Sequence, residues 1–459
     1  MACNFLPYDP AQRYLLPPSI SGWVGEGSLA RFVAGVVEEL DGEGRLAVFY
    51  AGYREDGWGR AGYHPRMLVK VLLYGYCCGV TSSRRIAQAL EEHAAFRYLA
   101  ANQQPGFRTS NEFRRTHLEA LEGLFVEVRR LCQEAGLAKM GRVALDGRKV
   151  AGNAALDQNR DTGAIEREVR RMLAEAERVD AEEDAQYGPG RRGGELPEDF
   201  RTKEGRLKRL KEARARLAEA EREAREEQEQ KIEAREAEEQ ASGRKQPGRK
   251  PKPPEEAVDA EAKASLTGPD SRILKTRKGW LQGYNGQAMA DCETQVIVAQ
   301  GLTQAENGVN QLAPMLNACE TQAGQRPGEV LGGAGYWSEA NAGLAGENTE
   351  LFIATTKGWK QRKALRERGA PRGRIPRSAT AREHMERKLL TKRGQAAYRQ
   401  RGSTIEAVFG QMALRGLNRF WLRGVDKVRA EWSLWCATHN LLKLWRAHRA
   451  VAQAVYAAA

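Results

Sequence analysis

Apolar residues recur at helical spacing through the first third of the chain. The segment 65–78 (PRMLVKVLLYGYCC) opens with Pro65, which suits a first helical turn, and its apolar residues share one helix face. The run 82–99 (SSRRIAQALEEHAAFRYL) repeats this pattern, with one of its two leading serines as the cap. Together with the neighbouring amphipathic stretches, these segments predict an all-helical domain over residues 1–141.

The turn Gly79-Val80-Thr81 joins these two predicted helices, as in a helix-turn-helix unit. Arg84 and Arg85 follow the turn directly. Further positive charge comes from Arg97, Arg108, Arg114 and Arg115. We interpret residues 1–141 as a domain that binds double-stranded DNA and includes Arg84 and Arg85 in its contacts. The alternative is an ordinary helical bundle with a solvated basic face.

The spacing of apolar residues changes from a helical to an extended pattern at Arg142. The segment 142–150 (RVALDGRKV) has the extended pattern of a strand that carries one acid, Asp146. We therefore expect the first strand of a second domain within residues 142–163.

A charged segment then interrupts this domain. Residues 164–240 consist mainly of Glu, Arg, Ala and Lys, with Gly and Pro near 187–197, which predicts a charged helical hairpin. The sparse apolar spacing favours a solvated helical insertion over a coiled coil. A basic Pro-rich linker at 243–254 follows, so we place the insertion and linker at residues 164–262.

The remaining residues, 263–459, alternate strand and helix patterns. Strands are predicted at 280–289 and 294–301, joined around Asp291, and again at 329–331 and 351–355. Helices are predicted at 311–320, after Ser338, and in a late region where Ile405, Val408, Phe409 and Met412 share a face.

Composition adds a candidate partner. The formal net charge is +13, with 73 Lys and Arg against 60 Asp and Glu, which favours binding to a polyanion such as nucleic acid. The seven cysteines are scattered without zinc-ligand spacing, so reduced, buried thiols are expected. With no leader at the N-terminus and no window of about 20 apolar residues, we expect no membrane association and a cytoplasmic protein.

Several segments resemble bacterial insertion-sequence transposases of the DDE superfamily, in the subgroup with a helical N-terminal domain and a late Tyr-Arg-Glu signature. The matching segments are 146–149 (DGRK), 283–287 (GYNGQ), 334–338 (AGYWS), 398–401 (YRQR), 406–411 (EAVFGQ), 423–424 (RG), 431–432 (EW) and 440–443 (NLLK). The resemblance implies an α/β RNase H-like core, a mixed sheet flanked by helices. It also implies a nucleoid-associated protein that binds terminal inverted repeats and target DNA as a homodimer.

The resemblance implies metal-dependent chemistry as well. Strand cleavage and joining are in-line displacements at phosphorus, assisted by two divalent metals about 4 Å apart that prefer carboxylate ligands. By resemblance, Asp146 bridges Mg²⁺ or Mn²⁺ ions and Glu406 holds one of them, so both are predicted catalytic residues. The alternatives are a polar residue near a turn for Asp146 and a solvated helix residue for Glu406.

The same resemblance predicts phosphate contacts near the cleavage site. Tyr398 and Arg401 precede Glu406 at the spacing of the subgroup, and the planar fork of Arg suits phosphate oxygens. The family often places Lys seven residues after the Glu, where this chain has Ala413. Arg415 would then have to substitute, or the contact is lost.

The chain departs from the family at the second acid. Where the motif reads Asp-Ala-Gly-Tyr, this chain reads Gly333-Ala334-Gly335-Tyr336, and Gly268 and Gly308 also stand where relatives commonly carry Asp. Neither Asp291 nor Glu339 is expected to reach the missing position.

Three functions therefore stay open: a transposase, a catalytically dead DNA-binding relative that represses transposition, and a structural module built on the charged hairpin. The presence of both Asp146 and Glu406 argues against the third. Whether the chain is an active enzyme depends on Gly333.

Overall fold

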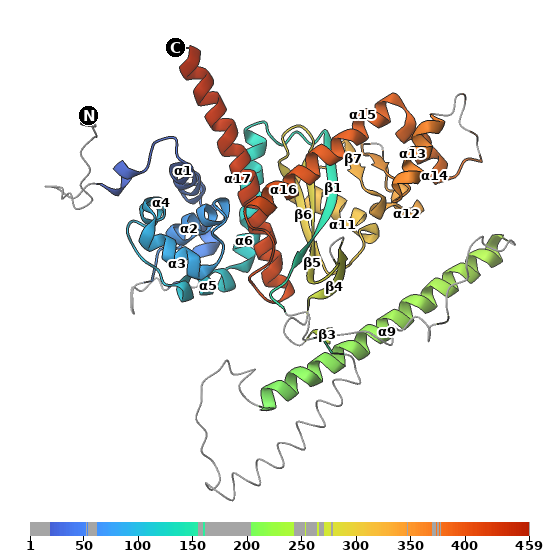
Figure 1. Cartoon of the computed structure of the whole chain (residues 1–459), viewed down its shortest axis with the longest axis horizontal. Coiled ribbons are helices and arrows are strands. Elements are labelled where there is room, and N and C mark those ends of the chain that lie inside the picture. Colours follow the sequence, from blue (N-terminus) through green and yellow to red (C-terminus); the bar gives the residue numbers. More distant parts are fainter. Residues whose placement is uncertain are drawn as a thin grey trace, which may run out of the picture.

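The computed structural model describes residues 19–458 except 52, 54–61, 155–158, 161–202, 243–252, 254–263, 266–269, 277–278, 347, 370–372, 374–375 and 377. Figure 1 shows N-terminal helices on one side of a central sheet, with α17 and α6 between them and α9 lying apart. None of the helices among the described residues combines the length and apolar character that crossing a bilayer needs.

Helices form the described N-terminal part of the chain. They are α1 (Leu29–Gly42), α2 (Pro65–Cys77), α3 (Ser83–Glu92), α4 (Ala94–Leu99), α5 (Phe107–Thr116) and α6 (Leu118–Glu134), with 3₁₀ turns at Ile20–Trp23 and Ala47–Tyr50. The helix predicted at 65–78 is confirmed as α2, which is buried on most of its surface and contacts α1 and α17. Between α2 and α3, Gly79 has a φ of +76°, which glycine adopts without strain.

The single helix predicted over 82–99 is wrong. His93 has extended backbone angles, with φ −110° and ψ 122°, and it ends α3 and begins α4. The break turns α4 so that Phe96 packs edge-on against Tyr74 of α2, with ring centres 5.0 Å apart. Packing onto α2 therefore overrides the continuous helical pattern.

The sheet is mixed, as expected. Its strands are β1 (Arg142–Ala151), β4 (Arg272–Thr276), β5 (Gly279–Asp291), β6 (Ile297–Thr303), β7 (Glu329–Gly332) and β8 (Glu350–Ile353). The central strand β1 pairs antiparallel with β5 and parallel with β7, and β7 pairs parallel with β8. Both β4 and β6 pair with β5. The pattern missed only the short strand β4 of this sheet.

Helices cover the sheet and extend from its far edge. They are α11 (Leu312–Ala323), α12 (Glu339–Ala342), α13 (Trp359–Arg368), α14 (Ala381–Leu390), α15 (Lys392–Arg401), α16 (Ala407–Leu414) and α17 (Val425–Ala458), with 3₁₀ turns at Val309–Gln311 and Ala334–Tyr336 and a π-helical turn at Gly402–Glu406. The predicted cap of α12 is confirmed, since the Ser338 hydroxyl accepts from the backbone N of Asn341 at 3.0 Å.

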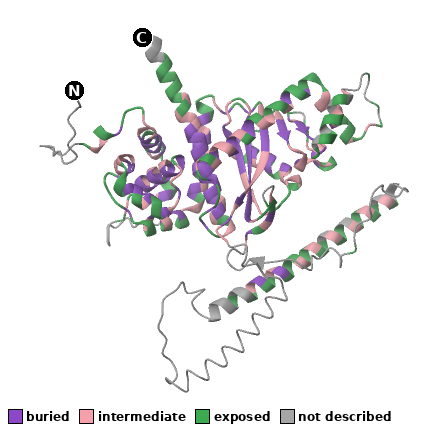
Figure 2. Ribbon diagram, in the orientation of Figure 1, coloured by how far each residue is buried: buried purple, intermediate pink, exposed green. Residues whose placement is uncertain are grey.

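The two faces of the sheet carry separate hydrophobic cores. Val143 and Leu145 of β1 join a core with α11, whereas Ala144 joins the larger core with α16, α17 and the N-terminal helices. The late helical face predicted from the sequence is confirmed, because Ile405, Val408, Phe409 and Met412 are all buried in the larger core. Figure 2 shows buried residues concentrated in the sheet and in the helices packed against it.

The charged insertion is anchored at both ends. The strand β2 (Asn159–Arg160) pairs antiparallel with β3 (Ala264–Ser265), so the chain leaves and rejoins the core at one place. Between them α9 (Lys203–Ser242) is a single long helix, mostly exposed or half-buried (Figure 2). The first arm of the predicted hairpin, 164–202, and nearly all of the linker at 243–254 lie outside the described residues.

Candidate active site

Strand pairing brings Asp146 beside Gly333. In the parallel ladder between β1 and β7, Leu145 is paired with Gly332, so the next residues of the two strands are neighbours. The carboxylate of Asp146 is half-buried, and its Oδ1 accepts from the backbone N of Gly147 at 2.9 Å. Gly333 has φ −71° and ψ 167°, a conformation open to any residue. The backbone conformation at position 333 therefore does not require glycine.

A π-helical turn carries the second predicted acid. Residues Gly402–Glu406 form this turn between α15 and α16, and Thr404 and Ile405 are buried within it. The Thr404 hydroxyl donates to the carbonyl oxygen of Gln400 at 2.7 Å. With Ile405 held in the core, Glu406 faces outward with its side chain 71% exposed. Such turns occur frequently at functional sites because they re-aim side chains.

Arg401 links the two acids. Its Nη2 lies 2.5 Å from Oδ2 of Asp146, and its Nη1 lies 3.8 Å from Oε1 of Glu406. A Cβ atom built on Gly333 would lie 3.1 Å from Nη2 and 3.4 Å from Cζ of the same guanidinium. Arg401 thus occupies the space towards which a side chain at position 333 would point.

The comparisons with known proteins bear on this region. Residues 361–445 match the family described as Transposase DDE domain, and residues 18–116 match the family described as Transposase domain (DUF772). These matches support a DDE transposase. The first match contains Arg401 and Glu406, but neither match reaches Asp146 or Gly333. No curated protein and no solved structure matches the chain.

A DDE transposase domain implies dependence on a divalent metal in general, but this site does not fit one. Among the described residues, no group of three or more His, Cys, Asp or Glu side chains lies close enough to hold a metal ion. The two predicted carboxylates, Asp146 and Glu406, instead share a guanidinium, whose positive charge repels a cation at the same place. Asp146 and Glu406, the metal ligands predicted by resemblance, therefore have no third carboxylate beside them, and both contact Arg401.

The other acids of the sheet do not supply the missing ligand. Asp291 pairs with Val143, three residues along β1 from Asp146, so it lies roughly 10 Å down the strand. Its Oδ1 accepts from the backbone N atoms of Glu293 and Thr294 at 2.9 and 3.1 Å, which makes it a turn residue. The expectation that Asp291 does not replace the second acid agrees with this register.

A group of polar residues beside Asp146 was missed by the sequence analysis. The hydroxyl of Tyr336 donates to Oε1 of Gln287 on β5, and burial raises the pKa of Tyr336 well above its usual value, with the charge of Asp146 adding to the effect. A Cβ on Gly147 would lie 2.2 Å from Nε2 of Gln287 and 2.6 Å from Oδ1 of Asn285. The signal was present in the segment 283–287, which the resemblance included without assigning roles.

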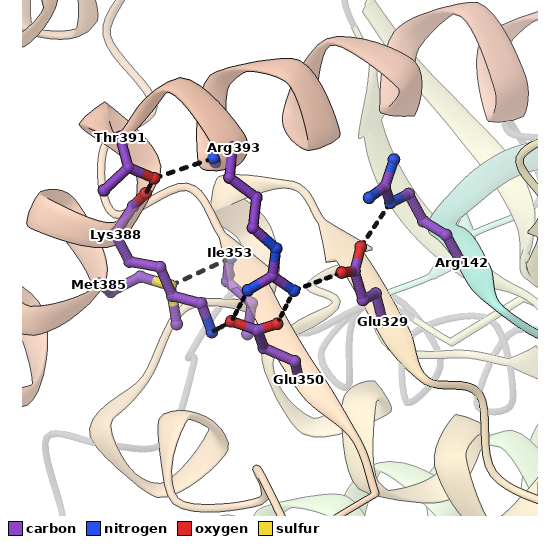
Figure 3. A network of polar contacts seen from close by, with 9 residues as sticks. Arg142, Glu329, Glu350, Ile353, Met385, Lys388, Thr391 and Arg393 are labelled. Carbon is purple, nitrogen blue, oxygen red and sulfur yellow. Dashed lines mark hydrogen bonds and ion pairs between the residues drawn. The ribbon is translucent and has the colours of Figure 1, made fainter.

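Ion pairs hold α15, the helix that ends at Arg401, against the sheet. Figure 3 shows the network that Arg393 forms with Glu329 and Glu350. Arg393 bonds Glu329 of β7 at 2.6 Å and also contacts Glu350 of β8, while Arg142 of β1 lies 2.5 Å from Glu329. Although burial acts to raise it, hydrogen bonds from Arg142 and Arg393 lower the pKa of Glu329. Lys388 of α14 joins the network at 2.8 Å from Glu350.

The structure separates the predicted phosphate contacts into two groups. Tyr398 and Arg401 both line a cavity of about 450 Å³ beside α14 and α15. Arg415 instead lies over the ring of Trp435, with its guanidinium carbon 5.7 Å from the ring centre, and burial lowers its pKa. Its Nη1 and Nη2 are buried, so this guanidinium faces the interior and not the acids. In this conformation Arg415 therefore does not replace the Lys that relatives often carry at the position of Ala413.

The N-terminal arginines also fall into two groups. Arg84 and Arg85 are exposed on α3, as a role in DNA binding requires. Arg114 is buried, and its Nη1 donates to the carbonyl oxygen of Thr81 at 2.9 Å and to the hydroxyl of Tyr76 at 3.2 Å. Arg114 therefore does not add to the exposed positive charge, because the packing of α5 against α3 buries it, which helical spacing alone did not show.

Proposed function

We propose that this chain is a transposase-type protein that binds the ends of an insertion sequence in double-stranded DNA and, as its sequence stands, does not cut them. The core is an RNase H-like unit, a proposal that the strand order β6-β5-β1-β7-β8 and the late helix with Glu406 support. The observation that carries the proposal is the guanidinium of Arg401 between Asp146 and Glu406, beside the empty position at Gly333.

The reason is electrostatic. Transposition chemistry depends on carboxylates that hold divalent cations around the reacting phosphate. Here one carboxylate is absent, and an internal cation partly neutralises the two that remain. Loss of a partner even one shell away from a metal costs about 10- to 100-fold in affinity or activity, so loss of a direct ligand costs more.

DNA binding is retained in this proposal because it needs none of those carboxylates. The net charge of +13 and the exposed Arg84 and Arg85 favour a polyanionic partner. A bound protein without nuclease activity would occupy element ends and act as a repressor of transposition, as a homodimer that pairs two ends.

The test uses the purified full-length chain and duplexes that contain the noncoding DNA on either side of its own coding sequence. We expect these duplexes to be shifted before an unrelated duplex of equal length, and no strand to be cut in Mg²⁺ or Mn²⁺. Affinity should fall with salt at a log-log slope of about −0.9 per phosphate contacted. No shift of any duplex at low salt would refute the proposal.

An intact transposase is the competing function. It predicts metal-dependent cleavage of the flanking duplex by the unaltered chain, and Asp146→Ala separates such cleavage from a contaminating nuclease. Cleavage that disappears in Asp146→Ala would establish the active enzyme and refute the binding-only proposal. Light scattering of the DNA complex checks the homodimer in the same samples.

A further inference from the structure

A groove of about 1250 Å³ lies between the N-terminal helices and the core, away from the predicted acids. Arg84 comes from α3, and Phe107, Arg108 and Arg115 come from α5. The opposite side is formed by Asn153, which follows β1, and by Trp421, which precedes α17. The groove is therefore built jointly by the two parts of the chain.

Two aromatic rings in this groove are open to solvent. The side chain of Trp421 is 43% exposed and that of Phe107 is 41% exposed, in a protein where most large apolar side chains of the described residues are buried. The guanidinium carbons of Arg84 and Arg108 lie 5.5 and 5.9 Å from the centre of the Phe107 ring. The groove thus combines flat apolar faces with positive charge.

Trp421 is held in place from three directions. Its indole Nε1 donates to the hydroxyl of Thr81 at 3.0 Å, its backbone N donates to the carboxylate of Glu431 at 2.9 Å, and its carbonyl accepts from Nδ2 of Asn153 at 2.9 Å. A ring fixed in this way loses little conformational freedom when a ligand stacks on it. The exposed indole is therefore already fixed in position for a ligand to stack on it.

The charge of the groove points to an anionic ligand. Among its described lining residues, Arg84, Arg108 and Arg115 are exposed arginines, and the one acid, Glu112, lies 3.2 Å from Arg115. Phosphate groups suit guanidinium forks, and unpaired bases suit exposed aromatic faces. A duplex covers its base faces by stacking, so a single strand fits this combination better.

We propose that the groove binds a single-stranded segment of DNA, with a base stacked on Trp421 and phosphates near Arg84 and Arg108. This inference rests on the proposed function, in which the partner is DNA. Asn153 lies seven residues beyond Asp146, just past the end of β1. The span is about 23 Å, or roughly seven stacked nucleotides of one strand. An end bound near the acids could place its frayed strand in this groove.

The experiment measures binding of the full chain to a 12-nucleotide single strand that carries one 2-aminopurine, and to a blunt duplex. We expect quenched 2-aminopurine emission with the single strand. In Trp421→Leu, single-strand affinity should fall by about 5- to 140-fold for the lost stack. Phe107→Leu removes the ring on which Arg84 and Arg108 lie, so it should lower single-strand affinity as well. The matched control is Trp280→Leu, since Trp280 is 58% exposed on β5 and is not part of the groove.

The outcomes are distinct. Loss of single-strand binding in both groove variants, with blunt-duplex binding and the Trp280→Leu control unchanged, supports the inference. Single-strand affinity equal to that of the unaltered chain in both groove variants overturns it while leaving the proposed function in place. Failure to bind either DNA in the unaltered chain refutes the proposed function as well. Because Phe107→Leu leaves the anchoring bonds of Trp421 intact, it keeps the test valid if Trp421→Leu unfolds.

Discussion

Two arginines of this protein lie near carboxylates in opposite surroundings. Arg401 contacts Asp146 on the central strand β1 and Glu406 on the π-helical turn, and the Glu406 side chain is largely exposed. Arg114 lies in the interior, where the hydroxyl of Tyr76 accepts from it at 3.2 Å and donates to Glu431 at 3.4 Å. The first contact can be exchanged with water or a ligand, whereas the second is sealed between α2, α5 and α17.

The difference shows which contact belongs to the fold. Glu431 also accepts from the backbone N atoms of Trp421 and Leu422, both at 2.9 Å, so it satisfies two main-chain donors just before α17. Burial raises the pKa of Glu431, although Arg114 acts to lower it. An arginine near a carboxylate is therefore structural in the interior, where Tyr76 joins the two, and available for chemistry or ligand exchange beside Gly333.

The largest expected effect is on the interior carboxylate. Glu431→Ala leaves the buried Tyr76 hydroxyl and the backbone N atoms of Trp421 and Leu422 without their acceptor, and it removes the negative charge near the buried Arg114. We expect the free energy of unfolding to fall by about 3–5 kcal/mol. Glu406→Ala, at an exposed position, should change it by less than about 0.5 kcal/mol. Guanidinium unfolding followed by circular dichroism measures both. Equal losses in the two variants would remove the distinction between the contacts.

The next prediction changes the surroundings of the Arg401 contact. Gly333→Asp adds a third carboxylate within reach of Arg401, Asp146 and Glu406, and we expect Mn²⁺ affinity in calorimetry to rise by at least about 10- to 100-fold. Metal-dependent cleavage of element ends should appear in the same variant and disappear when Asp146→Ala is added.

The matched control is Gly335→Asp, two residues away, where a Cβ meets no atom within 4 Å. The same Mn²⁺ affinity in both variants would mean that added charge alone attracts the metal. Of the two other positions where relatives commonly carry Asp, Gly268 lies outside the described residues and Gly308 has more crowded surroundings than Gly333. A Cβ there would lie 2.9 Å from the ring of Tyr336, so Gly308→Asp requires that ring to shift.

The interior should also respond to pH. Burial lowers the pKa of His439 to about 3, and its Nε2 lies 2.9 Å from the carbonyl oxygen of Gln295, where a neutral ring donates. An unfolded His titrates near 6.5, so the unfolded state binds more protons between the two values. We therefore expect the free energy of unfolding to fall as pH drops from about 6.5 towards 3.

The contribution of His439 to the pH dependence of the free energy of unfolding approaches about 1.4 kcal/mol per pH unit. His439→Gln, whose amide can donate to the same carbonyl, should lose this part of the slope in unfolding curves recorded at pH 7, 6, 5 and 4. An unchanged slope in the variant would assign the acid sensitivity to other groups.

Much of the fold was predictable because its elements depend on local pattern. The strand at 142–150 and the pair at 280–289 and 294–301 follow from extended apolar runs between turns. The break at His93 was not predictable, because it depends on packing of Phe96 against a helix that the pattern treats separately.

The candidate site was predictable only in part. The resemblance identified Asp146, Arg401 and Glu406 as site residues, but the contact between Arg401 and Asp146 joins positions 255 residues apart. No spacing rule shows that the guanidinium points into the place of a missing side chain. The groove was missed for the same reason, since Arg84 and Trp421 come together only through the packing of α3 and α5 beside the core.

A small effect on stability is also expected at Arg401. The side chains of Arg401 and Asp146 are 16% and 30% exposed, so water still reaches this ion pair. Ion pairs that water and salt screen contribute about 0–1 kcal/mol. Arg401→Ala should therefore lower the free energy of unfolding by less than about 1 kcal/mol, although it leaves Asp146 and Glu406 as neighbouring carboxylates. The same two carboxylates, no longer neutralised, should make Mn²⁺ binding measurably stronger in Arg401→Ala than in the unaltered chain. Arg399→Ala, an exposed neighbour on α15, is the matched control and should alter neither quantity. A loss of several kcal/mol in Arg401→Ala would mean that this arginine, like Arg114, holds the fold together and is not an exchangeable cation at the candidate site.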